Sequence, residues 1–319
     1  MRLTRFALGR HAIASGPKLG VLLEEEGVIV DLAAALSLSA AAAGDMQAFL
    51  TGGDASNAAA AAAVASGLHR IDINQVRLLA PISNPGKILC VGMNYEDHCL
   101  EQGMPIPDEP VIFCKFANAV LDPGAPIPLI PECKNLDFEV ELAIVIGKPC
   151  YRCSEEDALS YVAGLTTAHD VSARGWQIKR NSGQWFLGKG FDGFAPMGPA
   201  IVSCDELGGS AGIHSLAIKC FLNGEEVQSS TTAQMVHGVE ACIAWISTFM
   251  TLSPGDVIFT GTPPGVGCFR TPQLWLKDGD EVTVEIEKIG SVTNRVQAVK
   301  PTDRGNSALL KRLSPETAP

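Results

Sequence analysis

The sequence predicts an α+β protein that is mostly β, in which a large β-rich domain follows a small α/β domain. From residue 81 to about residue 300, short apolar runs such as KILCVG, ELAIVIG and GDVIFTGT alternate with glycine and proline turns. Helical spacing in this region is limited mainly to residues 154–163 and 234–250. This pattern favours a mostly antiparallel, rolled or sandwiched sheet over a doubly wound parallel sheet.

The small domain is expected to span residues 1–80. RLTRFAL near its start alternates as a first strand does, although its acid-free, arginine-bearing composition also suits a transit peptide. Residues 18–32 predict two strands joined by an acidic turn that ends at Gly27. The alanine-rich stretches 33–50 and 54–70 predict two helices separated by Gly52 and Gly53.

The second boundary lies at Pro81, where alanine-rich sequence gives way to proline-punctuated strands. The larger domain is expected over residues 81–300, with a helix near 154–163 that is capped by Ser154. Residues 301–319 are expected to form a polar C-terminal tail.

Composition excludes several functional classes. The chain has 319 residues, a net charge of −11 and a pI near 5.0, which argues against binding to nucleic acid or to an anionic membrane surface. No apolar run approaches the roughly 20 residues of a membrane span. Ten cysteines, mostly single, fit a reducing compartment, so we expect a cytoplasmic protein, with the mitochondrial matrix as the alternative. Cys150 and Cys153 form a C-x-x-C pair without the second pair that a zinc site needs.

An unusual group of acids lies in NLDFEVELAIVIGK, residues 135–148, which predicts one β-strand. Asp137, Glu139 and Glu141 are two residues apart and would share one face, about 6.6 to 6.8 Å between neighbours. Such carboxylates would repel one another in a dry site unless a cation lay between them, and Mg²⁺ prefers oxygen ligands of this kind. The alternative is an edge strand whose acids face solvent or pair with lysines.

Two further segments add polar groups to this region. In TTAHDVSARGWQ, Asp170 follows an apolar run and precedes Arg174 and Gln177, so it is either a third metal ligand or the N-cap of a helix. In QWFLGKGFDGFAPMGP, Lys189 lies among glycines that let backbone approach a ligand. The near match to a phosphate-binding loop is rejected, because Gly190 replaces the required serine or threonine.

Two more segments complete the set. GDVIFTGTPPGVG ends a strand at Thr262 and closely spaced glycines, a combination that either binds a carboxylate or simply makes a tight loop. In GMNYEDHCLEQG, His98 and Glu101 are three residues apart on a predicted short helix. One helix face would then present a general base with its orienting partner, or an ordinary solvated pair.

Taken together and in this order, these five segments resemble the fumarylacetoacetate hydrolase (FAH) superfamily over residues 81 to 300. The blocks MNYEDHCLEQGMPIPDEPVIFCKFA and VQSSTTAQMV are most similar to its fumarylacetoacetate hydrolase domain-containing protein 2 subgroup. Two positions depart from the pattern: Gly175 stands where many relatives carry an acid, and Gly190 where they carry serine or threonine.

The resemblance implies an FAH-type mixed β-sandwich roll, usually a homodimer, that binds Mg²⁺ or Mn²⁺ and takes Ca²⁺ in crystals. Asp137 would have a supporting role. The implied metal ligands are Glu139, Glu141 and Asp170; the implied catalytic residues are His98, Glu101 and Lys189; and the implied substrate-binding residues are Arg174, Gln177 and Thr262.

The activity implied is stabilisation of the enolate of a small anionic 2-oxo acid or dicarboxylate, with oxaloacetate keto-enol tautomerisation as the leading expectation. The alternatives are C-C bond hydrolysis of acylpyruvate or fumarylacetoacetate type, and decarboxylation or isomerisation of related 2-oxo dicarboxylates in aromatic catabolism. A non-enzymatic alternative is a metal-binding scaffold that has the same fold.

Overall fold

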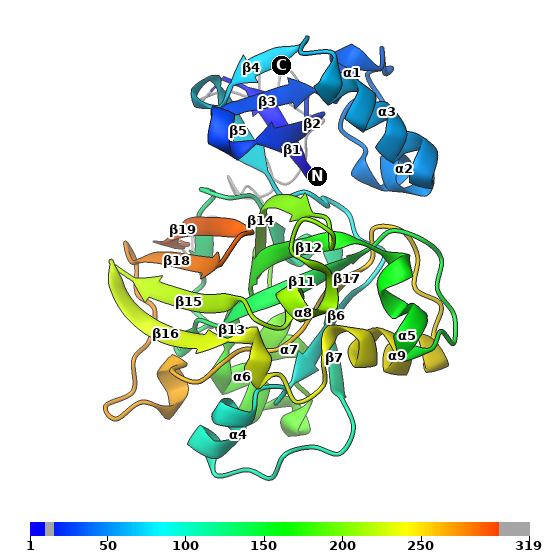
Figure 1. The fold of residues 1–319 in the computed structure, drawn as a ribbon. Helices are drawn as coiled ribbons and strands as arrows, with labels where there is room; N and C mark the ends of the chain where they lie inside the picture. Colours follow the sequence, from blue (N-terminus) through cyan, green and yellow to red (C-terminus); the bar gives the residue numbers. More distant parts are fainter. Residues whose placement is uncertain (10–15, 300–319) are drawn as a thin grey trace.

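The computed structural model describes residues 1–9 and 16–299, so the predicted tail, residues 301–319, lies outside the described residues. Twelve of the described strands form one long mixed sheet (Figure 1). Its path runs through β4 (Arg70–Asp72), β3 (Val28–Asp31), β2 (Lys18–Leu23), β1 (Arg2–Leu8), β14 (Ala195–Val202), β12 (Val162–His169), β11 (Val140–Ile146), β17 (Val257–Phe259), β6 (Ile88–Gly92) and β7 (Val111–Lys115). Beside this path, β5 (Val76–Leu79) pairs with β1, and β8 (Val120–Leu121) pairs with β14.

The N-terminal strands and three helices form a lobe at one end of the molecule (Figure 1). RLTRFAL is strand β1, as predicted, and β2 and β3 form the expected hairpin, in which Gly27 has a positive φ of 66°. The first alanine-rich stretch is not one helix, because Asp45 starts a new helix by accepting a hydrogen bond from the Ala48 amide at 2.9 Å. The helices of the lobe are α1 (Leu32–Ala35), α2 (Met46–Thr51) and α3 (Gly53–Ala65).

The long sheet joins this lobe to the larger part of the chain. Strand β1 pairs with β14 in antiparallel fashion, with Arg2 opposite Val202 and Leu3 opposite Ile201. The division at residue 81 therefore remains a prediction, since one sheet runs through both parts.

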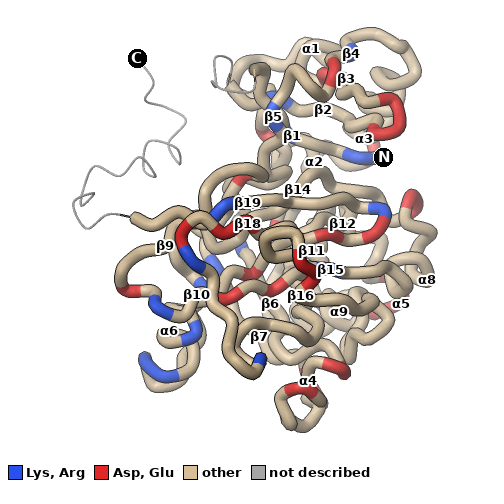
Figure 2. The backbone as a smooth tube through the Cα atoms, turned by 90° about the vertical axis from the view of Figure 1, so that its left-hand side faces the viewer, with Lys and Arg blue, Asp and Glu red and all other residues tan. Residues whose placement is uncertain are grey.

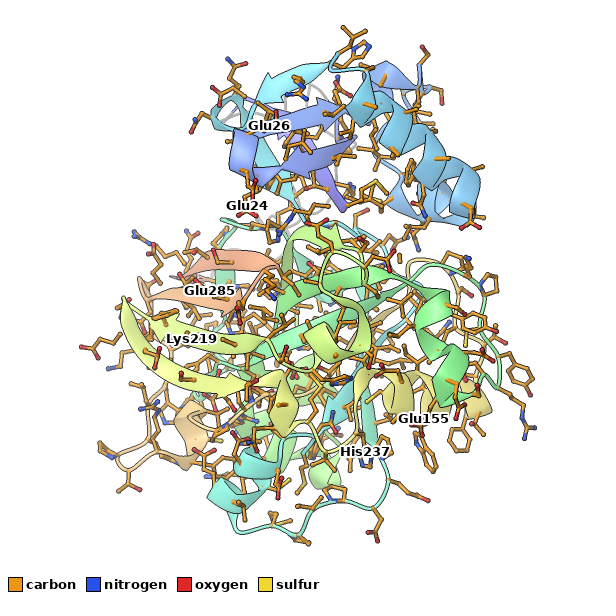
Figure 3. The ribbon with its side chains drawn as sticks, in the orientation of Figure 1. Glu24, Glu26, Glu155, Lys219, His237 and Glu285 are labelled. Atoms are coloured by element: carbon orange, nitrogen blue, oxygen red, sulfur yellow. The ribbon has the colours of Figure 1, made fainter. Side chains whose placement is uncertain are left out.

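A second sheet covers the centre of the long one. It contains β16 (Glu225–Thr231), β15 (Ala217–Leu222), β18 (Glu281–Ile286), β19 (Gly290–Ala298) and β9 (Ile127–Leu129). Alternate residues of β18 are buried against β12, while on its outer side Glu285 lies opposite Lys219, which pairs with Glu226 at 2.9 Å (Figure 3). Two sheets packed face to face confirm the mostly β, sandwich-type fold.

Helices lie at the edges of this sandwich. Ser154 caps α5 (Glu155–Ala158) as predicted, and α5 packs against α9 (Val239–Phe249) within the predicted segment 234–250. None of the helices in the described part of the chain is long and apolar enough to span a bilayer. The other α-helices are α4 (Glu96–Gln102), α6 (Arg174–Ile178), α7 (Phe186–Lys189) and α8 (Gly209–Ile213). Short 3-10 helices span Glu24–Glu26, Ile73–Gln75, Ala117–Ala119, Leu159–Tyr161, Asn181–Gly183, Thr232–Gln234 and Gly267–Phe269.

The predicted strand over residues 135–148 is interrupted. Leu136–Asp137 form β10, which pairs with β13 (Ser172–Ala173), and β11 starts only at Val140. At the break, the Val140 amide donates to the Gln228 side chain at 2.9 Å, and the Glu139 carbonyl accepts from the Asp170 amide at 2.9 Å. A side chain thus replaces a ladder partner, so the expectation of one continuous strand was wrong.

Candidate active site

The three predicted metal ligands come together where β11 begins and β12 ends. One carboxylate oxygen from each of Glu139, Glu141 and Asp170 lies within 4.8 Å of the others, and all three side chains are buried. Antiparallel pairing sets Glu141 opposite Ala168, so Asp170, just beyond β12, reaches the same place. The acids do not lie on an edge strand and do not face solvent, although Glu139 and Asp170 do pair with lysine, and Asp170 does not cap α6.

Two buried cations hold these acids. The Lys189 ammonium donates to Glu139 at 2.8 Å, to Asp170 at 2.6 Å and to the Ser172 hydroxyl at 2.7 Å. Burial opposes the charge on Lys189, but Asp170 and Glu139 raise its pKa above the ordinary value. Burial would likewise raise the pKa of Glu139, yet Arg174 and Lys189 lower it to about 2. At neutral pH this part of the site is therefore ionic.

Asp137 holds the arginine rather than joining the acid triad. It accepts from Arg174 at 2.8 Å and from the backbone amides of Gly267 and Cys268 at 2.7 and 3.0 Å. The same guanidinium donates to Glu139 and, at 2.9 Å, to Gln177. Asp137 thus fixes the orientation of Arg174, which agrees with the supporting role expected for it.

Lys115 belongs to the site, although sequence reasoning missed it. Its ammonium is buried at the end of β7 and donates to the carbonyls of Val171, Lys189 and Phe194 at 3.1, 2.7 and 2.8 Å. Asp170 Oδ1 lies 2.6 Å from the same nitrogen, so Lys115 and Asp170 form a buried ion pair. A lysine that ends the apolar run VIFCK was the only sequence signal.

The donor set fits a hard divalent cation. Glu141 accepts from the Gly261 amide at 2.7 Å, and burial, Asp170 and Glu139 raise its pKa. Asp170 Oδ1, which has an ion pair with Lys115 but no hydrogen bond, and the Glu141 carboxylate, which has no cationic partner among the described residues, are groups that such an ion would bind. The buried site holds four carboxylates and three cations, which leaves one negative charge. These residues are Asp137, Glu139, Glu141, Asp170, Lys115, Arg174 and Lys189.

His98 and Glu101 form a bonded pair on α4, as their spacing predicted. His98 Nδ1 lies 2.8 Å from Glu101 Oε2, and the Gly265 amide donates to Glu101 Oε1 at 2.9 Å. Burial would raise the pKa of Glu101, but the hydrogen bonds from His98 and Gly265 lower it below its ordinary value. The glycine-rich loop thus fixes Glu101, which in turn orients the imidazole.

These groups converge on one cavity of about 370 Å³. Asp170 and Glu101 stand behind its surface, bonded to Lys189 and His98 respectively. The other seven predicted site residues line it: His98, Glu139, Glu141, Arg174, Gln177, Lys189 and Thr262. The structure therefore brings all nine predicted residues to a single place.

Gln228 is a second site residue that sequence reasoning missed, and it holds Thr262 in place. Its amide nitrogen donates to the Thr262 hydroxyl at 2.9 Å and to the Pro263 carbonyl at 2.8 Å, while its oxygen accepts from Val140. Gln228 therefore ties the threonine loop to the start of β11. The segment VQSSTTAQMV contains it, but no motif in that segment indicated a brace.

At both positions that depart from the family pattern, the neighbouring site residue is still held by its side-chain partners. A Cβ added at Gly175 would lie 3.7 Å from Asn135 Oδ1, which is an ordinary contact, and Arg174 beside it keeps three side-chain partners. A Cβ at Gly190 would lie 3.1 Å from the Phe186 ring, and the neighbouring Lys189 is held by the acids.

Basic residues gather around α6 (Figure 2). Lys179 and Arg180 are exposed and follow Ile178, which lines the cavity, and the Arg180 guanidinium stacks over Trp176 at 4.6 Å from its ring centroid. In a protein of net charge −11, this local positive charge favours the approach of a small anion.

Known proteins are similar to this chain in sequence and in fold. Residues 87–297 match the family described as fumarylacetoacetate (FAA) hydrolase C-terminal. The mitochondrial oxaloacetate tautomerase fahd2 of Xenopus laevis is 48% identical over 93% of this chain and 90% of its own, and human mitochondrial oxaloacetate tautomerase FAHD2A is 48% identical over 93% and 91%.

A solved structure, maleylpyruvate hydrolase from Sphingobium sp. SYK-6 in complex with manganese(II) ion and pyruvate, superposes with a TM-score of 0.76 at 30% identity. The alignment covers 94% of this chain and all of that one. Because the family match covers most of the chain and relatives align almost end to end, the resemblance inferred from the motifs is confirmed, and the chain belongs to the fumarylacetoacetate hydrolase family.

Proposed function

We propose that the chain is a magnesium-dependent oxaloacetate keto-enol tautomerase, with manganese as an alternative ion. The observation that carries this proposal is the single cavity in which Lys189, beside a buried acid triad, faces the His98–Glu101 pair. Two relatives that are 48% identical and named oxaloacetate tautomerases support the choice of substrate.

The proposed ion would be held by Glu139, Glu141 and Asp170 and would act as a Lewis acid that draws electron density from the 2-oxo group. The Thr262 hydroxyl and the Gln177 amide line the cavity and are suited to bind the substrate carboxylate. Lys189, whose three donors are bonded to Glu139, Asp170 and Ser172, would act on the enolate through its fixed positive charge rather than as a hydrogen-bond donor.

The proton transfer is assigned to His98. Its Nδ1 is bonded to Glu101, which leaves Nε2 to exchange a proton. In the enol-to-keto direction the enol O-H proton is removed, C3 receives a proton, and the C2=C3 double bond becomes C2=O. The carbon skeleton is unchanged, so the tautomerase needs neither water nor a leaving group.

The same pair of residues favours a second candidate, C-C bond hydrolysis of an acylpyruvate. An imidazole oriented by Glu101 can equally activate water, and the manganese complex of the structurally similar maleylpyruvate hydrolase contains pyruvate. The full set of cavity-facing polar groups argues against a non-enzymatic scaffold.

We also propose that the chain forms a homodimer in the mitochondrial matrix. Apolar side chains of Leu100, Phe116 and Leu187 are exposed, which supports burial against a second copy. The names of the two relatives place those proteins in mitochondria, which favours this compartment over the cytoplasm. Size-exclusion chromatography with light scattering and organelle fractionation would test these two points.

The test of the proposed activity is the ultraviolet decay of freshly dissolved enol-oxaloacetate, with Mg²⁺ or with chelator, and product identification by NMR. Metal-dependent acceleration to keto-oxaloacetate with four carbons retained is expected. Lys189→Met should slow this by roughly 10²- to 10³-fold, the usual loss for one group that stabilises an oxyanion. Pyruvate as the enzymatic product would instead indicate decarboxylation, and no acceleration would favour acylpyruvates as substrates.

A further inference from the structure

One wall of the cavity is apolar and has no part in the proposed proton transfer. It is formed by Met93, Phe113 and Trp185, with Met104 and Phe269 partly exposed at the mouth. The volume of about 370 Å³ falls within the roughly 300 to 1,000 Å³ of pockets that hold drug-sized ligands. A four-carbon diacid leaves much of this space unused.

Trp185 is built firmly into that wall. Its ring meets Phe113 edge to face, with 5.3 Å between the ring centroids and 62° between the planes. The indole lies against the backbone of β6 because residue 92 is glycine: a Cβ there would be 2.7 Å from Trp185 Cζ3. The absence of a side chain at Gly92 therefore makes the room that the indole fills.

Phe113 connects this wall to the polar end of the cavity. The Lys189 ammonium lies 4.9 Å from the centroid of the Phe113 ring, and the same ring contacts Trp185. A 2-oxo acid whose 2-oxo oxygen is near Lys189 would direct a group on C3 toward these two rings. Aromatic rings recognise another ring by edge-to-face or offset contacts, so the wall suits an aryl substituent.

Resting on the proposed function, we propose that the cavity also accepts an arylpyruvate, a 2-oxo acid with an aromatic ring on C3, and catalyses its keto-enol tautomerisation. The enol O-H proton is lost, C3 gains a proton, and C2=C3 becomes C2=O, with no oxidant, reductant or water consumed. The aryl ring lies against Phe113 and Trp185 while the carboxylate and 2-oxo group occupy the polar end.

The experiment compares enol-phenylpyruvate and enol-oxaloacetate as substrates of the purified, magnesium-loaded protein, by ultraviolet decay. We expect magnesium-dependent acceleration with both. In Trp185→Ala, the ratio of kcat/KM for phenylpyruvate to kcat/KM for oxaloacetate should fall by about tenfold or more, the scale on which apolar pockets discriminate. Trp185→Leu, which keeps a branched apolar side chain but no ring, guards against misfolding of the alanine variant and should lower the same ratio.

Phe249→Ala is the matched control. Phe249 also forms an edge-to-face pair, with Trp245 at 5.3 Å, but it lies on α9 and does not line the cavity, so the ratio should not change. Conversion of oxaloacetate without any of phenylpyruvate would overturn this inference alone. If neither substrate is converted, both this inference and the tautomerase proposal are overturned. A ratio within twofold of wild type in both Trp185 variants would show that the ring does not contact Trp185.

Discussion

Replacing Lys115 with methionine should destabilise the protein strongly in the absence of metal. Methionine keeps most of the length of the side chain but removes the ammonium of Lys115, a residue that is 1% exposed. The change removes a donor from three buried carbonyls, of which only that of Phe194 keeps another, the Val171 amide, and it takes away the cation that lies 2.6 Å from Asp170 Oδ1. Asp170 then keeps only the ion pair with Lys189.

The size of the destabilisation follows from the buried groups that lose their partner when Lys115 is replaced. Removing one partner of a buried ion pair costs about 3 to 5 kcal/mol, because the remaining charge is no longer compensated. Each lost hydrogen bond from a charged donor contributes about 1.5 to 3 kcal/mol, but these terms overlap with the ion pair and do not add. We therefore expect the free energy of unfolding to fall by about 3 to 5 kcal/mol, out of a total near 5 to 15 kcal/mol.

Urea unfolding at pH 7 in chelator measures this loss. Asp170→Asn removes the charge that Lys115 faces, so the double variant should be less destabilised than the sum of the singles by about 1 kcal/mol or more. Lys219→Met, at an exposed ion pair with Glu226, is the control and should unfold at the wild-type urea concentration. A Lys115→Met midpoint equal to wild type, or strict additivity with Asp170→Asn, would refute the reasoning.

Three further changes test other parts of the site. His98→Ala should lower turnover by about 10²- to 10⁴-fold while calorimetry shows unchanged metal affinity, because the imidazole moves the proton and binds no ion. Burial raises the pKa of Glu141 above its ordinary value of 4.5. In chelator, the folded protein therefore keeps the proton of the Glu141 carboxyl at pH values where the unfolded chain has lost it, so the free energy of unfolding should fall as pH rises above 4.5. Glu141→Gln should remove that fall and abolish metal binding. Gln228→Leu leaves the buried Val140 amide without an acceptor, which should cost about 1 to 3 kcal/mol in urea unfolding and raise KM through Thr262.

Each of these three predictions has an outcome that would contradict it. Wild-type turnover in His98→Ala would remove the imidazole from the proton transfer. A metal-free Glu141→Gln protein whose stability still falls with pH would place the responsible carboxyl elsewhere. An unchanged urea midpoint in Gln228→Leu would mean that water or a shifted backbone satisfies Val140.

The acids of the site were predictable because their signal is local. Glu139 and Glu141 are two residues apart beside an apolar strand, and Asp170 directly follows another. Lys115 and Gln228 carry no such signal, because their partners are far away in sequence: Val171 is 56 residues from Lys115, and Val140 is 88 residues from Gln228. Only the packing of distant strands gives these two side chains their roles.

The class of the fold was predictable from the sequence, but the pairing of distant strands was not. Alternating apolar runs indicate strands, and the composition change at Pro81 suggests separate domains, yet β1 hydrogen-bonds β14 almost 200 residues later. Local composition contains no information on such long-range pairing. For the same reason the break at Glu139 was missed, since a glutamine from β16 replaces the neighbouring strand there.

The charge of the buried site bears on which 2-oxo acids it can turn over. Four carboxylates and three cations leave one negative charge, and a divalent ion would change this to one positive charge. With all four carboxylates ionised around the ion, a monoanionic 2-oxo acid would then make the site neutral, and its enolate would give the site one negative charge. A diacid brings one more negative charge, which the dry apolar wall cannot solvate. Its second carboxylate therefore belongs at the open mouth, near the exposed Lys179 and Arg180, whereas an aryl group belongs against Trp185.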